Sequence, residues 1–108
     1  MAVRMTADWS VLPGEVEVIG AAMQSLMVAI RAQPGCVSCS LSTQLGEQTR
    51  LRYEEEWRTE NDLNLQLRSE QFAKLANLME RAMERPRIEF SLPGGTRGIE
   101  YAEEVRGG

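Results

Sequence analysis

The apolar and polar residues of this chain recur with two periods, which divide it into strands and helices. Alternation with a period of two is typical of a strand that has one apolar face. Segments of this kind cover residues 3–10, 36–45, 50–58 and 87–92. Apolar residues spaced three and four apart indicate helices, which we expect over residues 16–33, 60–67 and 70–85.

Residues 93–108 are less regular than the rest of the chain. Residues 93–98 contain one proline and three glycines and predict a loop, and residues 99–105 can form a fifth, shorter strand. The order strand, helix, strand, strand, helix, helix, strand is that of a split βαβ pair. We therefore predict an α+β, ferredoxin-like fold in which residues 1–108 form a single domain, with helices on one face of an antiparallel sheet.

The second face of the predicted sheet carries serines, arginines and glutamates, with few large apolar side chains. Such a face either meets solvent or packs as a mixed interface against a second copy of the chain. A trailing strand after a glycine-rich loop can also pair with the sheet edge of a partner. We expect a homodimer for these reasons.

Composition and charge narrow the class of protein. The 108 residues are 43% hydrophobic and 26% charged, with a net charge of −4, which is typical of one globular domain. Acidic and basic residues are mixed along the chain, so we expect neither nucleic acid nor a membrane surface as a partner. The N-terminus lacks the pattern of an export signal, so we expect a cytoplasmic protein with reduced thiols.

The two cysteines form the motif Cys36-Val37-Ser38-Cys39, which elsewhere serves redox or zinc chemistry. In a regular strand, residues three positions apart point to opposite faces. The sequence has no third cysteine and no histidine, so a mononuclear metal site would lack soft ligands. We expect small strand cysteines and no metal. The lack of histidine also excludes a Ser-His-Asp triad, HExxH zinc hydrolysis and histidine-ligated haem within this chain.

The candidate chemistry lies on the third predicted strand, where Tyr53, Glu55 and Trp57 share one face. A carboxylate on an otherwise apolar face should have a raised pKa, which makes it a base usable near neutral pH. The alternative is that Glu55 lies at the rim of the sheet, paired with an arginine. We expect Trp9 and Trp57 to pack in the core, although Trp57 can also line a pocket between sheet and helices.

Three short motifs give the chain a resemblance to a known family. They are Pro34-Gly35-Cys36, Glu55-x-Trp57 and Leu67-x-Ser69-x-x-Phe72-x-x-Leu75. Together they resemble the antibiotic biosynthesis monooxygenase (ABM) family, also called quinol monooxygenase-like. The resemblance implies a dimeric α+β barrel, in which the sheets of two ferredoxin-like copies pack together. Some members oxidise phenolic or quinol-like molecules with O₂ and without metal or flavin, and others degrade haem.

The resemblance also implies roles for single residues. Trp57 matches the family tryptophan, and Glu55 matches the acid that often precedes it by two residues. Gln66 and Gln71 stand where the family commonly has histidines, which argues against haem degradation. We expect no cofactor and a small aromatic substrate, with Glu55 or Tyr53 removing a proton and with Trp57 and Gln66 donating hydrogen bonds to the anion. The candidate substrate-binding residues are Gln66, Phe72 and Trp9.

Two other functions stay open at this point. The chain can be a non-catalytic dimeric module that binds a small molecule or a protein, since both family histidines are replaced. It can also be an isomerase or decarboxylase on a related dimeric α+β barrel, with Glu55 as the base.

Overall fold

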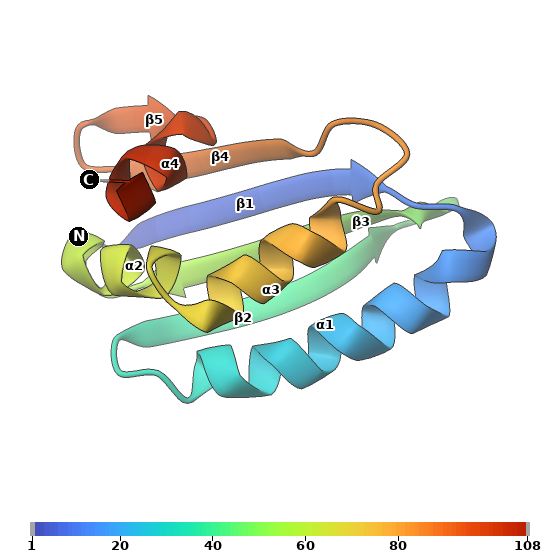
Figure 1. Ribbon diagram of the computed structural model, residues 1–108, viewed down its shortest axis with the longest axis horizontal. Helices are drawn as coiled ribbons and strands as arrows, with labels where there is room; N and C mark the ends of the chain where they lie inside the picture. Colours follow the sequence, from blue (N-terminus) through green and yellow to red (C-terminus); the bar gives the residue numbers. More distant parts are fainter. Residues whose placement is uncertain (1, 108) are drawn as a thin grey trace.

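The computed structural model describes residues 2–107. They contain one sheet of five antiparallel strands (Figure 1). In chain order the strands are β1 (Val3–Ser10), β2 (Cys36–Gln44), β3 (Glu47–Trp57), β4 (Arg87–Leu92) and β5 (Gly95–Arg97). The helices are α1 (Val16–Arg31), α2 (Glu60–Leu67), α3 (Glu70–Met79) and α4 (Glu100–Gly107), and a 3₁₀ turn at Pro13–Glu15 precedes α1. The strand order β2-β3-β1-β4-β5 and the helices confirm the predicted α+β, ferredoxin-like fold.

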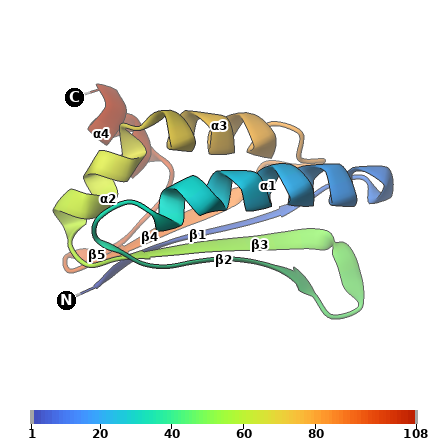
Figure 2. The ribbon, with the colours of Figure 1, turned by 90° about the horizontal axis from the view of Figure 1, so that it is seen from below.

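The helices all lie on one side of the sheet, and the other side is uncovered (Figure 2). On the covered side, strand alternation buries Val3, Met5, Ala7 and Trp9 of β1. β1 pairs with β3 on one side, Val3 opposite Trp57, and with β4 on the other, Met5 opposite Phe90. The core therefore lies between the central strands and the helix layer, as the period-two pattern predicts.

The connection from α1 to β2 depends on Gly35. Its φ of 89° lies in the left-handed region, which glycine adopts without the steric strain of a Cβ. A Cβ at this position would also overlap the carboxylate of Asp62. The Gly35 carbonyl accepts a hydrogen bond from the Arg58 backbone N–H at 2.8 Å. The Pro34-Gly35 pair thus holds the end of β3, and with it the start of α2, close to the end of α1.

Both helices that follow β3 begin at side-chain caps. The Thr59 hydroxyl accepts a hydrogen bond from the Asp62 backbone N–H at 3.1 Å, which opens α2. The Ser69 hydroxyl accepts one from the Phe72 backbone N–H at 3.3 Å, which opens α3. These two caps fix where the helix pair sits over the end of β3.

The expected helix over residues 70–85 is too long, because α3 ends at Met79. Beyond that point the chain turns back toward the sheet, and the Met83 backbone N–H donates to the Ser10 carbonyl at 2.8 Å. That contact uses the N–H in a link to the end of β1 instead of a helical turn. Met83, which lies within the expected helix, is 64% exposed.

The C-terminal prediction is also wrong in position and type. The strand expected over residues 99–105 is helix α4, and β5 lies within the expected loop, where Leu92 pairs with Gly95. The helix forms because its apolar residues match a helical period: Tyr101 and Ala102 are buried, and Val105, four residues after Tyr101, packs against the core. The Tyr101 ring packs on Phe90 with 5.3 Å between centroids.

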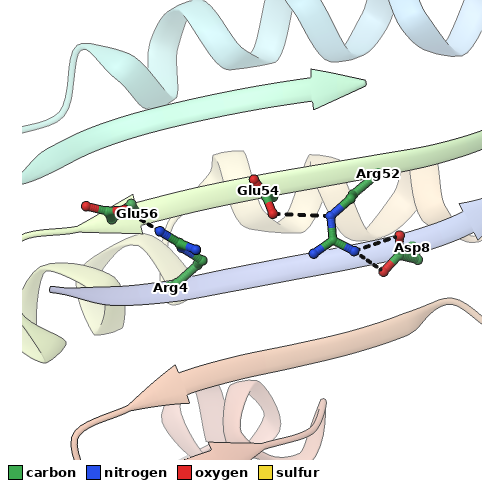
Figure 3. Close-up of polar contacts among 5 residues, drawn as sticks. All are labelled: Arg4, Asp8, Arg52, Glu54 and Glu56. Atoms are coloured by element: carbon green, nitrogen blue, oxygen red, sulfur yellow. Dashed lines mark hydrogen bonds and ion pairs between the residues drawn. The ribbon is translucent and has the colours of Figure 1, made fainter. Parts of the chain in front are cut away.

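The uncovered face of the sheet is polar, as the sequence predicts, and its charges are paired across strands (Figure 3). Arg4 of β1 contacts Glu56 of β3 at 2.7 Å, and Arg52 of β3 contacts Asp8 of β1 at 2.9 Å and Glu54 at 3.2 Å. Exposed pairs of this kind contribute only about 0–1 kcal/mol each, because water and salt screen them. Among residues 2–107, no helix combines the length and apolar character needed to cross a membrane.

Candidate functional site

The centre of the candidate site is Glu55, whose side chain has no exposed surface. Strand β3 points it toward the helix layer, between Tyr53 and Trp57 on the same face. The Tyr53 hydroxyl donates to Oε2, the Trp57 indole Nε1–H donates to Oε1 at 2.8 Å, and the Gln66 amide donates to Oε2 at 3.3 Å. No ion pair within residues 2–107 includes Glu55. The alternative of a carboxylate at the sheet rim, paired with an arginine, is therefore wrong.

The surroundings of this carboxylate favour its protonated form. Burial raises the pKa of Glu55, and the hydrogen bonds from Tyr53, Trp57 and Gln66 offset only part of that effect. Burial, followed by the nearby Glu55 carboxylate, also raises the pKa of Tyr53, so its hydroxyl keeps its proton and stays a donor. The arrangement is a carboxyl group that can accept a proton and three neutral donors that orient it.

Gln66 is held in one orientation by two residues that sequence reasoning did not assign to the site. The Gln33 side-chain amide donates to the Gln66 Oε1 at 2.8 Å. The Ser69 hydroxyl donates to the Gln66 backbone carbonyl at 2.6 Å and also lies 3.2 Å from Oε1. With Oε1 on the side of Gln33 and Ser69, Nε2 is the atom that faces Glu55. Ser69 was identifiable as a cap, but the contact between Gln33 and Gln66 spans 33 residues and leaves no local signal.

The two cysteines lie on the same face of the sheet, and the prediction of opposite faces is wrong. A β-bulge between Cys36 and Ser38 shifts the register, so that Cys36 lies opposite Trp57 and Cys39 lies opposite Glu55. The extra residue, Val37, is exposed instead of sharing the face of Cys39. The Cys39 Sγ contacts the Tyr53 hydroxyl at 3.2 Å. Burial raises the pKa of Cys39 to about 11, so the thiol is protonated at neutral pH.

The remaining candidates, Trp9 and Phe72, are buried but make none of the hydrogen bonds of Glu55. The indole N–H of Trp9 has no hydrogen-bond partner among the described residues. The ring of Phe72 lies under the guanidinium of Arg106, whose Cζ is 5.7 Å from the ring centroid. The structure thus brings Tyr53, Glu55, Trp57 and Gln66 into one network. Trp9 and Phe72 lie outside it.

The space around Glu55 is filled: Trp57 packs in the core, as expected, and the alternative that it lines an open pocket is wrong. Trp57, Glu55 and Gln66 are all fully buried because they pack against one another. An open groove of about 390 Å³ lies instead between α1 and α3. Its lining mixes small, apolar and amide side chains with one lysine: Ala22, Ser25, Leu26, Ala29, Gln71, Lys74, Asn77 and Leu78.

Comparison with known proteins gives a family match and several similar folds. The family model described as antibiotic biosynthesis monooxygenase matches residues 2–78. No curated protein sequence matches the chain. A conserved protein from Methanosarcina mazei is 25% identical over 85% of this chain and 92% of its own, with a TM-score of 0.78.

Two further solved structures share the fold at lower identity. Rv0793 from Mycobacterium tuberculosis is 19% identical over 86% of this chain and 95% of its own, with a TM-score of 0.74. A structure described as an antibiotic biosynthesis monooxygenase is 15% identical over 82% of this chain and 94% of its own, with a TM-score of 0.72. The segment that the family model matches, residues 2–78, includes the whole network around Glu55.

Proposed function

Since the chain belongs to the antibiotic biosynthesis monooxygenase family, we propose that it is a cofactor-independent oxygenase that oxidises a phenolic or quinol-like molecule with O₂. The observation that carries this proposal is the buried carboxyl group of Glu55. Its pKa is raised by burial, and three neutral donors orient it without neutralising it. A base of this kind can deprotonate a phenol near neutral pH.

In the proposed reaction, Glu55 accepts a proton from the substrate, and the resulting anion reduces O₂. A substrate whose activated methylene becomes a carbonyl supplies all the electrons, since O₂ then yields the carbonyl oxygen and one water. Protonation of Glu55 weakens its hydrogen bonds with Trp57 and Gln66. These two donors are then available for the substrate anion. No external reductant is required.

We place the substrate first in the groove between α1 and α3. Its volume of about 390 Å³ falls within the range of small-molecule sites, and the apolar side chains in its lining, such as Leu26 and Leu78, can contact an aromatic ring. Lys74, the only lysine in the sequence, lies on its rim and favours an anionic oxygen. Gln33 follows Ala29 of the groove by four residues. Opening of the contact between Gln33 and Gln66 is the step that we propose admits substrate to Glu55.

The proposal includes a homodimer formed through the uncovered sheet face. Pairs such as Arg52 with Asp8 are regularly spaced across β1 and β3 and can meet the same pairs on a second copy (Figure 3). Sedimentation velocity should give the mass of a dimer for the wild type. Arg52→Glu places like charges beside Asp8 and should shift the mass toward the monomer, whereas an unchanged mass would contradict this interface.

The oxygenase is tested by O₂ consumption and product mass across a panel of hydroquinones and anthrones. We expect turnover by the wild type, with loss in Glu55→Gln and Trp57→Phe. Glu54→Gln is the matched control, because it changes the neighbouring carboxylate on the opposite face. Rates that are the same in the wild type, Glu55→Gln and Trp57→Phe would overturn the assignment. Turnover that persists without O₂ would instead indicate an isomerase or decarboxylase.

A second candidate function is a non-catalytic dimeric module that binds a small molecule or a protein. The observation that favours it is the complete burial of Glu55, Trp57 and Gln66, together with glutamine in place of the family histidine. Ligands that raise the melting temperature without consuming O₂ would support it. In that case the groove between α1 and α3 would bind the ligand, and the network around Glu55 would only stabilise the fold.

A further inference from the structure

The carboxyl group of Glu55 needs a route by which its proton can return to solvent, and its three hydrogen-bond partners differ in whether they can provide one. A base that works repeatedly must return its proton to solvent, yet Glu55 has no exposed surface. The Trp57 indole only donates, and the Gln66 amide donates without passing a proton on. The Tyr53 hydroxyl is the one partner among these three that both donates and accepts.

Tyr53 continues the chain of contacts to a thiol. Its hydroxyl oxygen lies 3.2 Å from the Cys39 Sγ, and either atom can be the donor. Cys39 belongs to β2, which is an edge strand of the sheet. Cys39 is 5% exposed, whereas Tyr53 and Glu55 are both 0% exposed. Of these three residues, Cys39 is therefore the one that reaches solvent.

Two features hold the backbone of Cys39 in place. The bulge between Cys36 and Ser38 brings Cys39 opposite Glu55. The Arg31 guanidinium donates to the Cys39 carbonyl through Nη2 at 2.7 Å and through Nε at 3.0 Å. Arg31 ends α1, so this contact ties the edge strand to the helix above it. The thiol is thereby held at the Tyr53 hydroxyl.

We propose that Tyr53 and Cys39 form a proton relay between Glu55 and solvent at the β2 edge. The relay rests on the proposed function for the role of Glu55 as the base. To discharge it, the Glu55 carboxyl proton moves to the Tyr53 oxygen, the Tyr53 hydroxyl proton moves to the Cys39 sulfur, and the Cys39 thiol proton moves to water. Glu55 loses one proton, water gains one, and Tyr53 and Cys39 end as they began. The reverse order recharges Glu55.

Hydrogen–deuterium exchange of single side chains tests the relay without any substrate. The Tyr53 hydroxyl is followed by the isotope shift of its ¹³Cζ, and the Cys39 thiol by the isotope shift of its ¹³Cβ. Cys39→Val removes the proton carrier and should slow exchange at Tyr53 by about 10²-fold, the lower end of what a positioned proton-transfer group contributes. Cys39→Ser keeps a carrier and should exchange like the wild type. Cys36→Val is the control, since the Cys36 thiol donates to the Ser38 carbonyl and it is Cys39 whose sulfur meets the Tyr53 hydroxyl.

Equal exchange at Tyr53 in the wild type and in a folded Cys39→Val would overturn the relay. The wild type provides a second test that needs no variant. If every Tyr53 proton passes through the Cys39 sulfur, the thiol must exchange at least as fast as the hydroxyl, and a faster hydroxyl would also overturn the relay. Slowed exchange in Cys39→Val without O₂ turnover by the wild type would keep the relay and reject the oxygenase.

Discussion

Three consecutive glutamates of β3 lie on two sides of one sheet and in two different environments. Glu54 and Glu56 are on the uncovered face, where they pair with Arg52 at 3.2 Å and with Arg4 at 2.7 Å. Glu55 lies between them in sequence but beneath the helices, fully buried and with neutral donors only. The same side chain is thus ion-paired in water at two positions and enclosed at the third.

The comparison shows how strand alternation separates two kinds of chemistry. Water and arginines stabilise the charged form of a carboxylate on the open face. On the covered face, burial raises the pKa of Glu55, because removal of water penalises the charged form more than three neutral donors stabilise it. A shift of one residue along β3 therefore decides whether a glutamate is a surface charge or a candidate base.

The largest difference between the two faces should appear in catalysis. Glu55→Gln keeps the shape of the side chain but cannot accept a proton, so we expect kcat/KM for O₂ consumption to fall by about 10²- to 10⁴-fold. Glu54→Gln and Glu56→Gln, on the open face, should leave it unchanged. Equal losses in all three variants would remove the distinction between the faces.

The next difference should appear in stability. Tyr53→Phe removes one buried donor of Glu55 and leaves that carboxyl group with an unpaired position, so we expect a loss of about 1–3 kcal/mol in the free energy of unfolding. Arg52→Gln removes exposed ion pairs and should cost about 1 kcal/mol or less. Urea denaturation of both variants measures this. A larger loss in Arg52→Gln would reverse the comparison.

The pH dependence of stability should also depend on Glu55. Because folding raises its pKa, the native state binds that proton more tightly than the unfolded chain does. The wild type should therefore lose stability relative to Glu55→Gln as the pH rises from about 4.3, the value of an unfolded glutamate, to the raised pKa of the native state. Above that pKa the difference should stay constant. Thermal unfolding of both proteins across this pH range measures the difference in stability. A difference that does not change with pH would contradict the prediction.

The smallest effect should come from the pairs on the open face. At protein concentrations too low for the dimer to form, a double-mutant cycle of Arg4→Gln and Glu56→Gln should give a coupling of about 0.2–1 kcal/mol at low salt, because both side chains meet water in the monomer. The coupling should disappear in about 1 M NaCl, where the screening length falls to about 3 Å. A coupling in the monomer that survives high salt would contradict the exposure of this pair.

Much of this arrangement follows from local patterns. Alternation along β3 is enough to place Tyr53, Glu55 and Trp57 on one face, because the side-chain period of a strand is two. The caps at Thr59 and Ser69 were predictable for a similar reason, since a hydroxyl three residues before a helical N–H is a local signal. The family resemblance also rests on local patterns, the three short motifs.

What local patterns could not predict are features set by register and by distant contacts. The bulge at Cys36–Ser38 turns one cysteine to the other face of the sheet, and no residue in the motif indicates it. The contact between Gln33 and Gln66 joins residues far apart in sequence. The helix at the C-terminus was misread because Tyr101 and Val105 fit either period over so few residues.

The carboxyl group of Glu55 is central to the proposed function, and its titration is the most direct test. The chemical shift of its ¹³Cδ, followed by NMR across pH and assigned with Glu55→Gln, gives the pKa in the folded protein. We predict a midpoint clearly above about 4.3, the ordinary value for glutamate. A midpoint at or below that value would mean that Glu55 is charged at neutral pH without a raised proton affinity, and would contradict its role as the base.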